Sequence, residues 1–219
     1  MKGADMPKRE YGEFAPVAAD WSPEVAAPTR ARPAVTRSIS LLAFDPGGTT
    51  GWSLMELPLK YNGDIIFHAP FQKIIAIGSK SWHHGQIDCS DENAAFWQIG
   101  KLLNKAKDAA VITERFILAA QRSEKSDTLL APVRLNSLIE HHLWRQGRPL
   151  FSQTTGVVKP AFRDDRMKHF KVYTSEGGLE HARDADKHLL YFIKRCLGKE
   201  QKAQVLREMA WPYHFGSNK

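Results

Sequence analysis

The chain has 219 residues, of which 42% are hydrophobic, enough for one substantial core with tails. Lys and Arg outnumber Asp and Glu by 31 to 24, and the resulting net charge of +7 and pI near 9.4 favour a polyanionic partner. The absence of a membrane-length apolar run, of a signal pattern and of cysteine pairs at metal-ligand spacing argues against a membrane protein or a disulfide scaffold, so we expect a soluble, intracellular protein with reduced thiols.

The first 37 residues form a separate compositional segment. They contain five prolines scattered among Ala, Arg and Glu, without a sustained hydrophobic period. Such a composition predicts a disordered or extended arm. Arg30, Arg32 and Arg37 could contact nucleic acid, or the arm could be an inert tail. We expect the folded domain to span residues 38–198, with a C-terminal helix and tail over 199–219.

The first strand is predicted over residues 39–44, a continuous Leu-rich run that ends at Asp45. Gly47, Gly48 and Gly51 allow positive φ and close backbone approach, so we expect the chain to turn back into a second strand. The turn would hold an acid at the rim of the sheet, beside backbone that a phosphate or a metal can approach. The alternative is that Asp45 only opens a turn, as Asp-Pro pairs often do.

Two segments after the second strand are harder to assign. Residues 64–77 carry strand-like apolar content and predict a third strand. Residues 79–85 are expected to form a loop that presents Trp82, His83 and His84. These aromatic side chains could stack on a nucleic-acid base, although a loop tryptophan can equally be a packing anchor.

Helices and strands are expected to alternate through the middle of the chain. Ser90 or Asp91 can cap a helix, and Gly147 can end another. The expected elements are a helix to about residue 107, a strand over 109–114, a helix over 131–145 and a strand over 149–154. This alternation predicts an α/β sheet with parallel pairs.

Glu114 is the second acid at the end of an apolar strand. A carboxylate within a run of Val, Ile, Phe and Leu is costly to bury unless it is paired or binds a cation. Since Asp45 ends its strand in the same way, the two acids together indicate a shared cation.

A basic segment follows over residues 159–171. Lys159, Arg163, Arg166 and Lys168 could form a face that binds the DNA backbone. The alternative is an ordinary solvated helix.

The last informative segment, residues 180–197, predicts an amphipathic helix. His181 and Asp184 are neighbours at i and i+3, so they could enter one metal site together. Asp186 points away from Asp184, near the apolar arc, and we expect it to serve the helix N-terminus or a surface ion pair. The alternative for all these acids is that they only suit the helix dipole.

Three motifs together resemble the RuvC-like Holliday-junction resolvases, in particular phage-type members, within the ribonuclease H-like superfamily. They read AFDPGGTTG at residues 43–51, VITERF at 111–116 and HARDA at 181–185, and the resemblance covers roughly residues 39–197. It implies an α/β, ribonuclease H-like fold, a mixed five-stranded sheet flanked by helices, in a homodimer. The family's catalytic and metal-binding residues fall on Asp45, Glu114, His181 and Asp184, and its lysine after the fifth strand on Lys159.

The resemblance also implies an activity. It is that of a metal-dependent endonuclease that hydrolyses phosphodiester bonds in branched DNA such as Holliday junctions, in the cytoplasm of a bacterial or phage-infected cell. It implies two Mg²⁺ ions about 4 Å apart, with Mn²⁺ as a substitute, and carboxylates suit such ions as ligands. We expect Asp45 to bridge the ions, Glu114 to bind one, and His181 and Asp184 to bind the other.

Two other functions are compatible with parts of this pattern. The run from Asp45 to Gly51 also resembles the first phosphate loop of the actin, sugar-kinase and heat-shock-chaperone ATPases. Those proteins need a second such loop and usually a longer, two-lobed chain, and neither is found here. The other alternative is a non-catalytic DNA-binding protein with the same fold.

Overall fold

A computed structural model of the protein describes residues 37–116 and 127–216, and their elements all belong to the unit that spans residues 31–219. The expected N-terminal arm, with Arg30 and Arg32, lies outside the described residues. At the start of the described part, the Arg37 carbonyl accepts a hydrogen bond of 2.9 Å from the Leu59 amide. Among the described helices, none is both long and apolar enough to cross a membrane.

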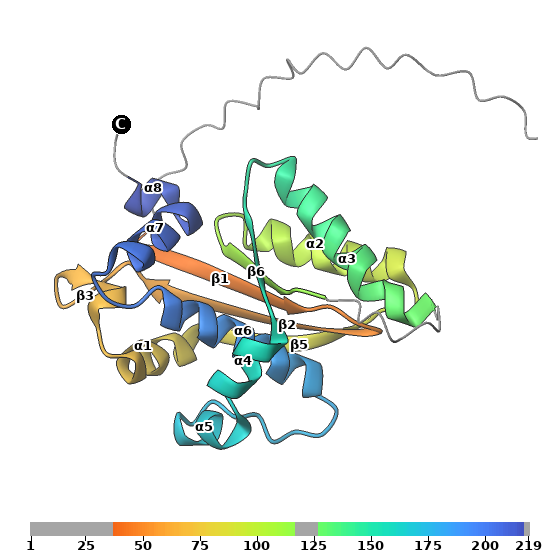
Figure 1. Ribbon diagram of the computed structural model, residues 1–219, viewed down its shortest axis with the longest axis horizontal. Coiled ribbons are helices and arrows are strands. Elements are labelled where there is room, and N and C mark those ends of the chain that lie inside the picture. Colours follow the sequence, from red (N-terminus) through yellow and green to blue (C-terminus); the bar gives the residue numbers. More distant parts are fainter. Residues whose placement is uncertain (1–36, 117–126, 217–219) are drawn as a thin grey trace, which may run out of the picture. The chain divides into compact units, whose positions relative to one another are not determined.

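A mixed five-stranded sheet forms the centre of this unit (Figure 1). In spatial order β5-β2-β1-β6-β7, the first three strands pair antiparallel and the last two join in parallel. The sheet, with helices on both faces, has the ribonuclease H-like arrangement expected from the sequence, so the predicted fold is confirmed. The strands are β1 (Ser38–Asp45), β2 (Thr49–Pro58), β5 (Trp82–Asp88), β6 (Ala110–Glu114) and β7 (Leu150–Gln153).

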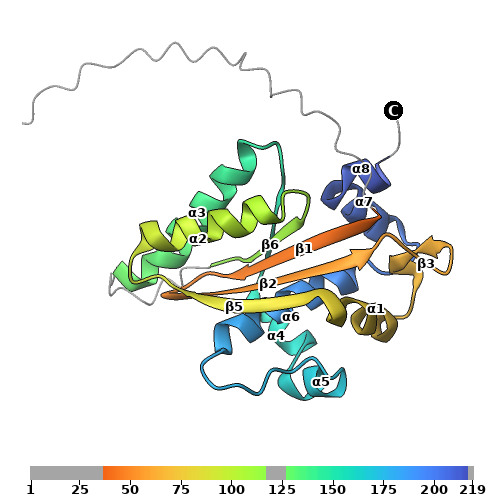
Figure 2. The ribbon, with the colours of Figure 1, turned by 180° about the vertical axis from the view of Figure 1, so that it is seen from behind.

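Helices cover the two faces of the sheet and bury two hydrophobic clusters (Figures 1 and 2). Successive side chains of a strand point to opposite faces, so Leu41 and Ala43 enter one cluster while Leu42 and Phe44 enter the other. One face carries α2 (Glu92–Lys105) and α3 (Asp127–Trp144), and the other carries α1 (Phe71–Gly78), α4 (Thr155–Ala161), α5 (Asp164–His169) and α6 (Glu180–Arg195). Burial on both faces explains the continuous apolar sequence of β1.

Helix boundaries follow local signals. The Asp91 side chain caps α2 as predicted, accepting hydrogen bonds from the Asn93 and Ala94 amides. The helix α3 begins at Asp127, four residues before the predicted start, and continues through Pro132.

Two predictions between β2 and α2 are wrong. Residues 64–77 do not form a third long strand: a short hairpin of β3 (Lys60–Tyr61) and β4 (Asp64–Ile65) leads through a 3-10 turn, η1 (Ile66–His68), into α1. The apolar residues there recur with helical spacing. The third long strand is β5, which was expected to be mostly loop and follows a second 3-10 turn, η2 (Ser79–Ser81). Its polar sequence is tolerated because it is an edge strand held by its ladder to β2.

The C-terminal elements α7 (Gln201–Ala210) and α8 (Pro212–Phe215) pack against the same core as α6. Trp211 is buried, stacks on Phe67 with ring centroids 5.4 Å apart, and donates a hydrogen bond of 3.1 Å to the Ser40 carbonyl. The Arg207 guanidinium donates to the carbonyls of Cys196 and Gly198 just after α6. These contacts fix the end of α6 that lies away from the acidic residues described below.

Candidate active site

The sheet brings Asp45 and Glu114 together. β1 and β6 are parallel neighbours, with Phe44 opposite Thr113, so the next residue of each strand lies at the same end of the sheet, where both strands finish. Asp45 is only 7% exposed and Glu114 is half-buried. The negative charge of Glu114 opposes ionisation of its neighbour Asp45.

The glycine turn after Asp45 leads back into the antiparallel strand β2 as predicted, but without the positive φ that was expected. Among the described glycines, those with positive φ do not include Gly47, Gly48 or Gly51. Gly51 pairs with Asp45, and a Cβ added to it would lie 1.9 Å from the His181 carbonyl oxygen. The missing side chain therefore lets the first turn of α6 rest directly on β2.

Gln86 of β5 fixes the same end of α6. Its side-chain oxygen accepts hydrogen bonds of 3.0 and 3.4 Å from the His181 and Ala182 amides. The residue before the helix, Leu179, supplies no side-chain cap, so Gln86 provides the acceptor that the free helix amides need.

Docking of α6 places His181 against Asp45, with Nδ1 3.1 Å from Oδ2. The hydrogen bond with Asp45 raises the pKa of His181. Asp184, one turn along, adds its negative charge to the field at Asp45. All four predicted acidic and imidazole groups thus lie at one end of the sheet. We call Asp45, Glu114, His181 and Asp184 the acidic centre.

The electrostatics of the two strand acids are opposite. Burial, reinforced by the negative charges of Glu114 and Asp184, raises the pKa of Asp45 to about 6, despite its hydrogen bond with His181. Burial also opposes ionisation of Glu114, but its interactions with His188, Asp45 and Thr155 outweigh burial and lower its pKa to about 2. Between pH values of about 2 and about 6, Glu114 is therefore ionised while Asp45 still holds its proton.

Asp184 faces two lysines. Its Oδ2 lies 2.7 Å from the Nζ of Lys159 on α4, and its Oδ1 lies 2.9 Å from the Nζ of Lys187. Burial alone would raise the pKa of Asp184, but these two ammonium groups lower it.

His188 is a site residue that the sequence analysis did not select. It is 0% exposed, its Nδ1 lies 3.1 Å from Gln153 Oε1, and its Nε2 lies 3.4 Å from Glu114 Oε2 without hydrogen-bond geometry. Thr155 donates a short hydrogen bond to the same carboxylate. A signal existed, since His188 shares the helix face of His181 and Asp184, but only the packing of α6 makes it a neighbour of Glu114.

Asp186 does not occupy the predicted surface position. It is 0% exposed, with Oδ1 3.1 Å from Trp82 Nε1 and Oδ2 2.8 Å from His84 Nδ1. The prediction failed because the polar strand β5, taken as a loop, supplies both partners. Asp186 and Trp82 therefore anchor α6 to the sheet edge, on a different side from Asp184.

The basic segment divides between two short helices. Lys159 on α4 points to the acidic centre through Asp184. Arg163 pairs with Asp165 at 3.0 Å, Arg166 donates to the Ala161 carbonyl, and Lys168 lies over the Tyr173 ring. The structure thus brings only Lys159, of the four predicted DNA-binding residues, into contact with the acidic centre.

The donor groups of the acidic centre meet only some of the requirements of a divalent cation. In residues 37–116 and 127–216, no three His, Cys, Asp or Glu side chains converge closely enough to hold a metal ion. The chemistry nevertheless fits a hard cation, because Asp45 and Glu114 offer adjacent carboxylate oxygens at the ends of neighbouring strands. His181 adds a nitrogen donor at the same place, while Asp184 can join only when its lysine pairs open.

Comparison with known proteins is informative at the level of fold. No family model matches the sequence, and no curated protein matches it. The structure is similar to a Thermus thermophilus RuvC in complex with Holliday junction substrate, with a TM-score of 0.47 and 11% identity over 69% of this chain and 90% of the other. A second Thermus thermophilus RuvC structure gives a TM-score of 0.46 and 12% identity over 69% and 92%. At this identity the likeness concerns the fold alone.

Proposed function

We propose that the protein is a metal-dependent endonuclease that hydrolyses phosphodiester bonds in branched DNA such as Holliday junctions. The proposal rests on one observation: four potential metal ligands lie together at one end of the sheet, namely Asp45, Glu114, His181 and Asp184. They come from three segments more than 60 residues apart in sequence, each positioned by a rigid strand or helix. The motif resemblance selected the same four residues.

The acidic centre suits Mg²⁺, with Mn²⁺ as a substitute. When bound, a pair of such ions supplies an activated water and neutralises charge on the leaving oxygen. Asp45 and Glu114 are the groups that would hold them, with His181 and Asp184 completing the set. Glu114 stays ionised throughout the neutral range, because its pKa is about 2. In the metal-free protein Asp45 becomes a full carboxylate only above a pH of about 6, so its proton competes with a metal ion below that pH.

The chain's own cations position the substrate in this proposal. Lys159 lies closest to the acidic centre and can receive a phosphate once it leaves Asp184. Arg163, Arg166 and Lys168 are exposed at and within α5, and in this proposal they add phosphate contacts that would make binding fall steeply with salt.

A homodimer completes the proposal. Resolving a four-way junction requires paired cuts on two strands, and a two-fold dimer presents two equivalent sites. Light scattering on the protein bound to a junction measures this, and a single protomer that makes only single nicks would contradict it.

An ATPase function is disfavoured by the packing of Gly51. The phosphate loops of ATPases need open backbone, whereas α6 fills the space beside this glycine. The nuclease proposal is tested by a gel assay with Mg²⁺ and a panel of linear, forked and four-way DNAs, using wild type, Asp45→Asn and Glu114→Gln. We expect wild type to cut branched DNA and both variants to bind without cutting. Equal cutting of linear duplex would refute the junction preference, and cutting by the variants would refute the metal site.

A further inference from the structure

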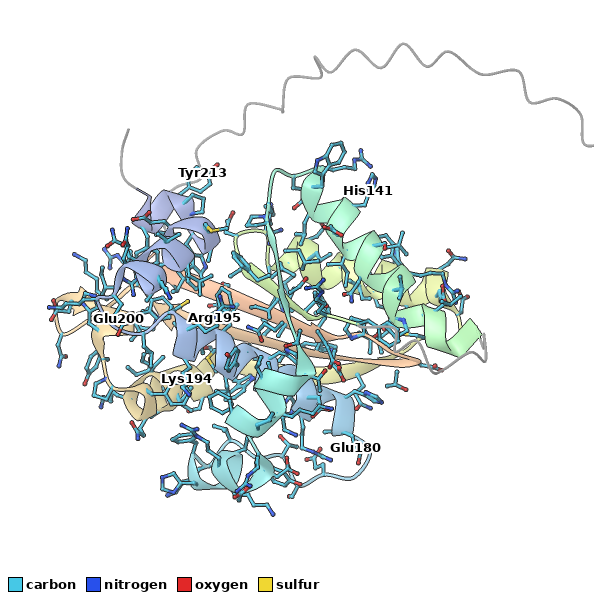
Figure 3. The ribbon with its side chains drawn as sticks, in the orientation of Figure 1. His141, Glu180, Lys194, Arg195, Glu200 and Tyr213 are labelled. Carbon is cyan, nitrogen blue, oxygen red and sulfur yellow. The ribbon has the colours of Figure 1, made fainter. Side chains whose placement is uncertain are left out.

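A hollow at the free edge of β7 has no role in the site described above. Its volume is about 420 Å³, and it lies between β7, α4 and α6. Six of the side chains that line it are polar or charged: Arg115, Ser152, Gln153, Thr154, Tyr191 and Arg195. We call it the edge hollow. Figure 3 shows Arg195 at the opposite end of α6 from Glu180.

The chemistry of the edge hollow is that of an anion site. Two exposed guanidinium groups reach it from different elements, Arg115 after β6 and Arg195 at the end of α6, and the described residues that line it include no carboxylate. Neither arginine has an ion-pair partner within the described residues. Guanidinium groups match phosphate oxygens in a bidentate geometry, and the hydroxyls of Ser152, Thr154 and Tyr191 add further donors.

A buried donor supports the same assignment. Gln153 is only 4% exposed, yet its side-chain nitrogen has no hydrogen-bond partner among the residues that the structure describes. Its oxygen is already engaged by His188. An unsatisfied buried amide is costly, and a bound anion would supply the missing acceptor.

The edge hollow is also connected to the acidic centre. Arg115 directly follows Glu114, and its amide donates a hydrogen bond of 2.7 Å to the Gln153 carbonyl. Gln153 contacts His188, whose other ring nitrogen lies 3.4 Å from Glu114. A phosphate in the edge hollow would therefore lie near the C-terminal ends of β6 and β7, and Glu114 of the acidic centre is the last residue of β6.

We propose that the edge hollow binds a backbone phosphate of the same DNA strand whose scissile phosphate lies at the acidic centre. This inference rests on the proposed function, since it names a second contact of the same substrate. A strand is favoured over free phosphate because the hollow is larger than one phosphate group, and because Arg115, which lines it, directly follows Glu114 in the chain. The half-buried Tyr191 also offers a surface for a sugar or a base.

The test uses the double variant Arg115→Gln and Arg195→Gln, with Lys194→Gln as the matched control. Lys194 is the exposed neighbour of Arg195 on α6 and does not line the edge hollow (Figure 3). Binding of a fluorescent four-way junction is measured by anisotropy in a metal chelator over a range of salt concentrations. We expect the double variant to bind about tenfold more weakly, with a salt slope smaller by about 0.9 for each lost phosphate contact. The control should match wild type.

Each outcome separates this inference from the proposed function. If wild type cuts junctions and the double variant binds them like the control, the edge hollow inference is wrong and the nuclease stands. If wild type neither binds nor cuts DNA, the proposed function has failed first. A second arm measures thermal unfolding with inorganic phosphate or a nucleoside monophosphate. Stabilisation of wild type but not of the double variant, together with unchanged DNA affinity, would identify a free-phosphate site and overturn the strand assignment.

Discussion

Replacement of Gly51 by alanine should displace the helix that carries half of the candidate site. The added Cβ would meet only backbone: the His181 carbonyl oxygen at 1.9 Å, its carbon at 2.1 Å and the Ala182 nitrogen at 2.7 Å. Ordinary contact begins at 3.4 Å, so the first turn of α6 has to retreat by about 1.5 Å. Leu189 and Phe192 hold the rest of the helix in the core, so it cannot move freely as a rigid body.

The expected cost is at least about 3 kcal/mol, the upper part of the range for overpacked cores. For a chain of this length that corresponds to a fall in Tm of about 6 to 12 °C. Because His181 would move away from Asp45 by more than about 1 Å, cleavage should fall about a hundredfold or more even where the variant remains folded.

Thermal unfolding in a metal chelator measures the first effect without reference to activity. The matched control is Gly100→Ala in the middle of α2, where an added Cβ meets no atom within 4 Å. That variant should gain about 0.5 to 1 kcal/mol, since alanine suits a helix interior better than glycine. If Gly51→Ala unfolds within 2 °C (about 1 kcal/mol) of wild type, the close packing of α6 on β2 is wrong.

Three further predictions concern the acidic centre. Asp45→Asn should stabilise the metal-free protein at neutral pH. The pKa of Asp45 in the folded protein is about 6, above the ordinary 3.8, so the stability that its proton contributes below pH 3.8 is lost as the pH rises to about 6. The asparagine variant has no such loss. Unfolding curves from pH 4 to 8 should show the difference in unfolding free energy between the variant and wild type growing with pH to at most about 3 kcal/mol. A difference that does not change with pH would contradict this prediction. His181→Asp should stay active and shift preference from Mn²⁺ toward Mg²⁺, whereas a folded variant that is dead with both ions would refute the equivalence of the two ligands. Asp184→Asn should cost several orders of magnitude in cleavage rate at saturating Mg²⁺. Asp186→Asn should cost less than about tenfold in rate, or about 1.4 kcal/mol, but lower the Tm; the reverse ranking would exchange the two roles.

Local patterns in the sequence were enough to identify the elements that carry the site. The apolar runs ending at Asp45 and Glu114 are strands in the structure, because strands buried on both faces leave a continuous apolar signature. The period of residues 180–197 identified α6 and placed His181 and Asp184 on one face. The ends of buried strands and the face of one helix can therefore be identified from local sequence patterns alone.

The other features of the site depend on contacts between distant segments. Asp186 is buried because β5, about a hundred residues earlier, offers Trp82 and His84 as partners. His188 joins Glu114 only through the docking of α6, and that docking requires the missing side chain of Gly51. A polar residue has the same local pattern whether it faces water or a buried partner. Its role is decided by the hydrogen bonds that tertiary packing supplies, since a buried polar group without them is too costly to keep.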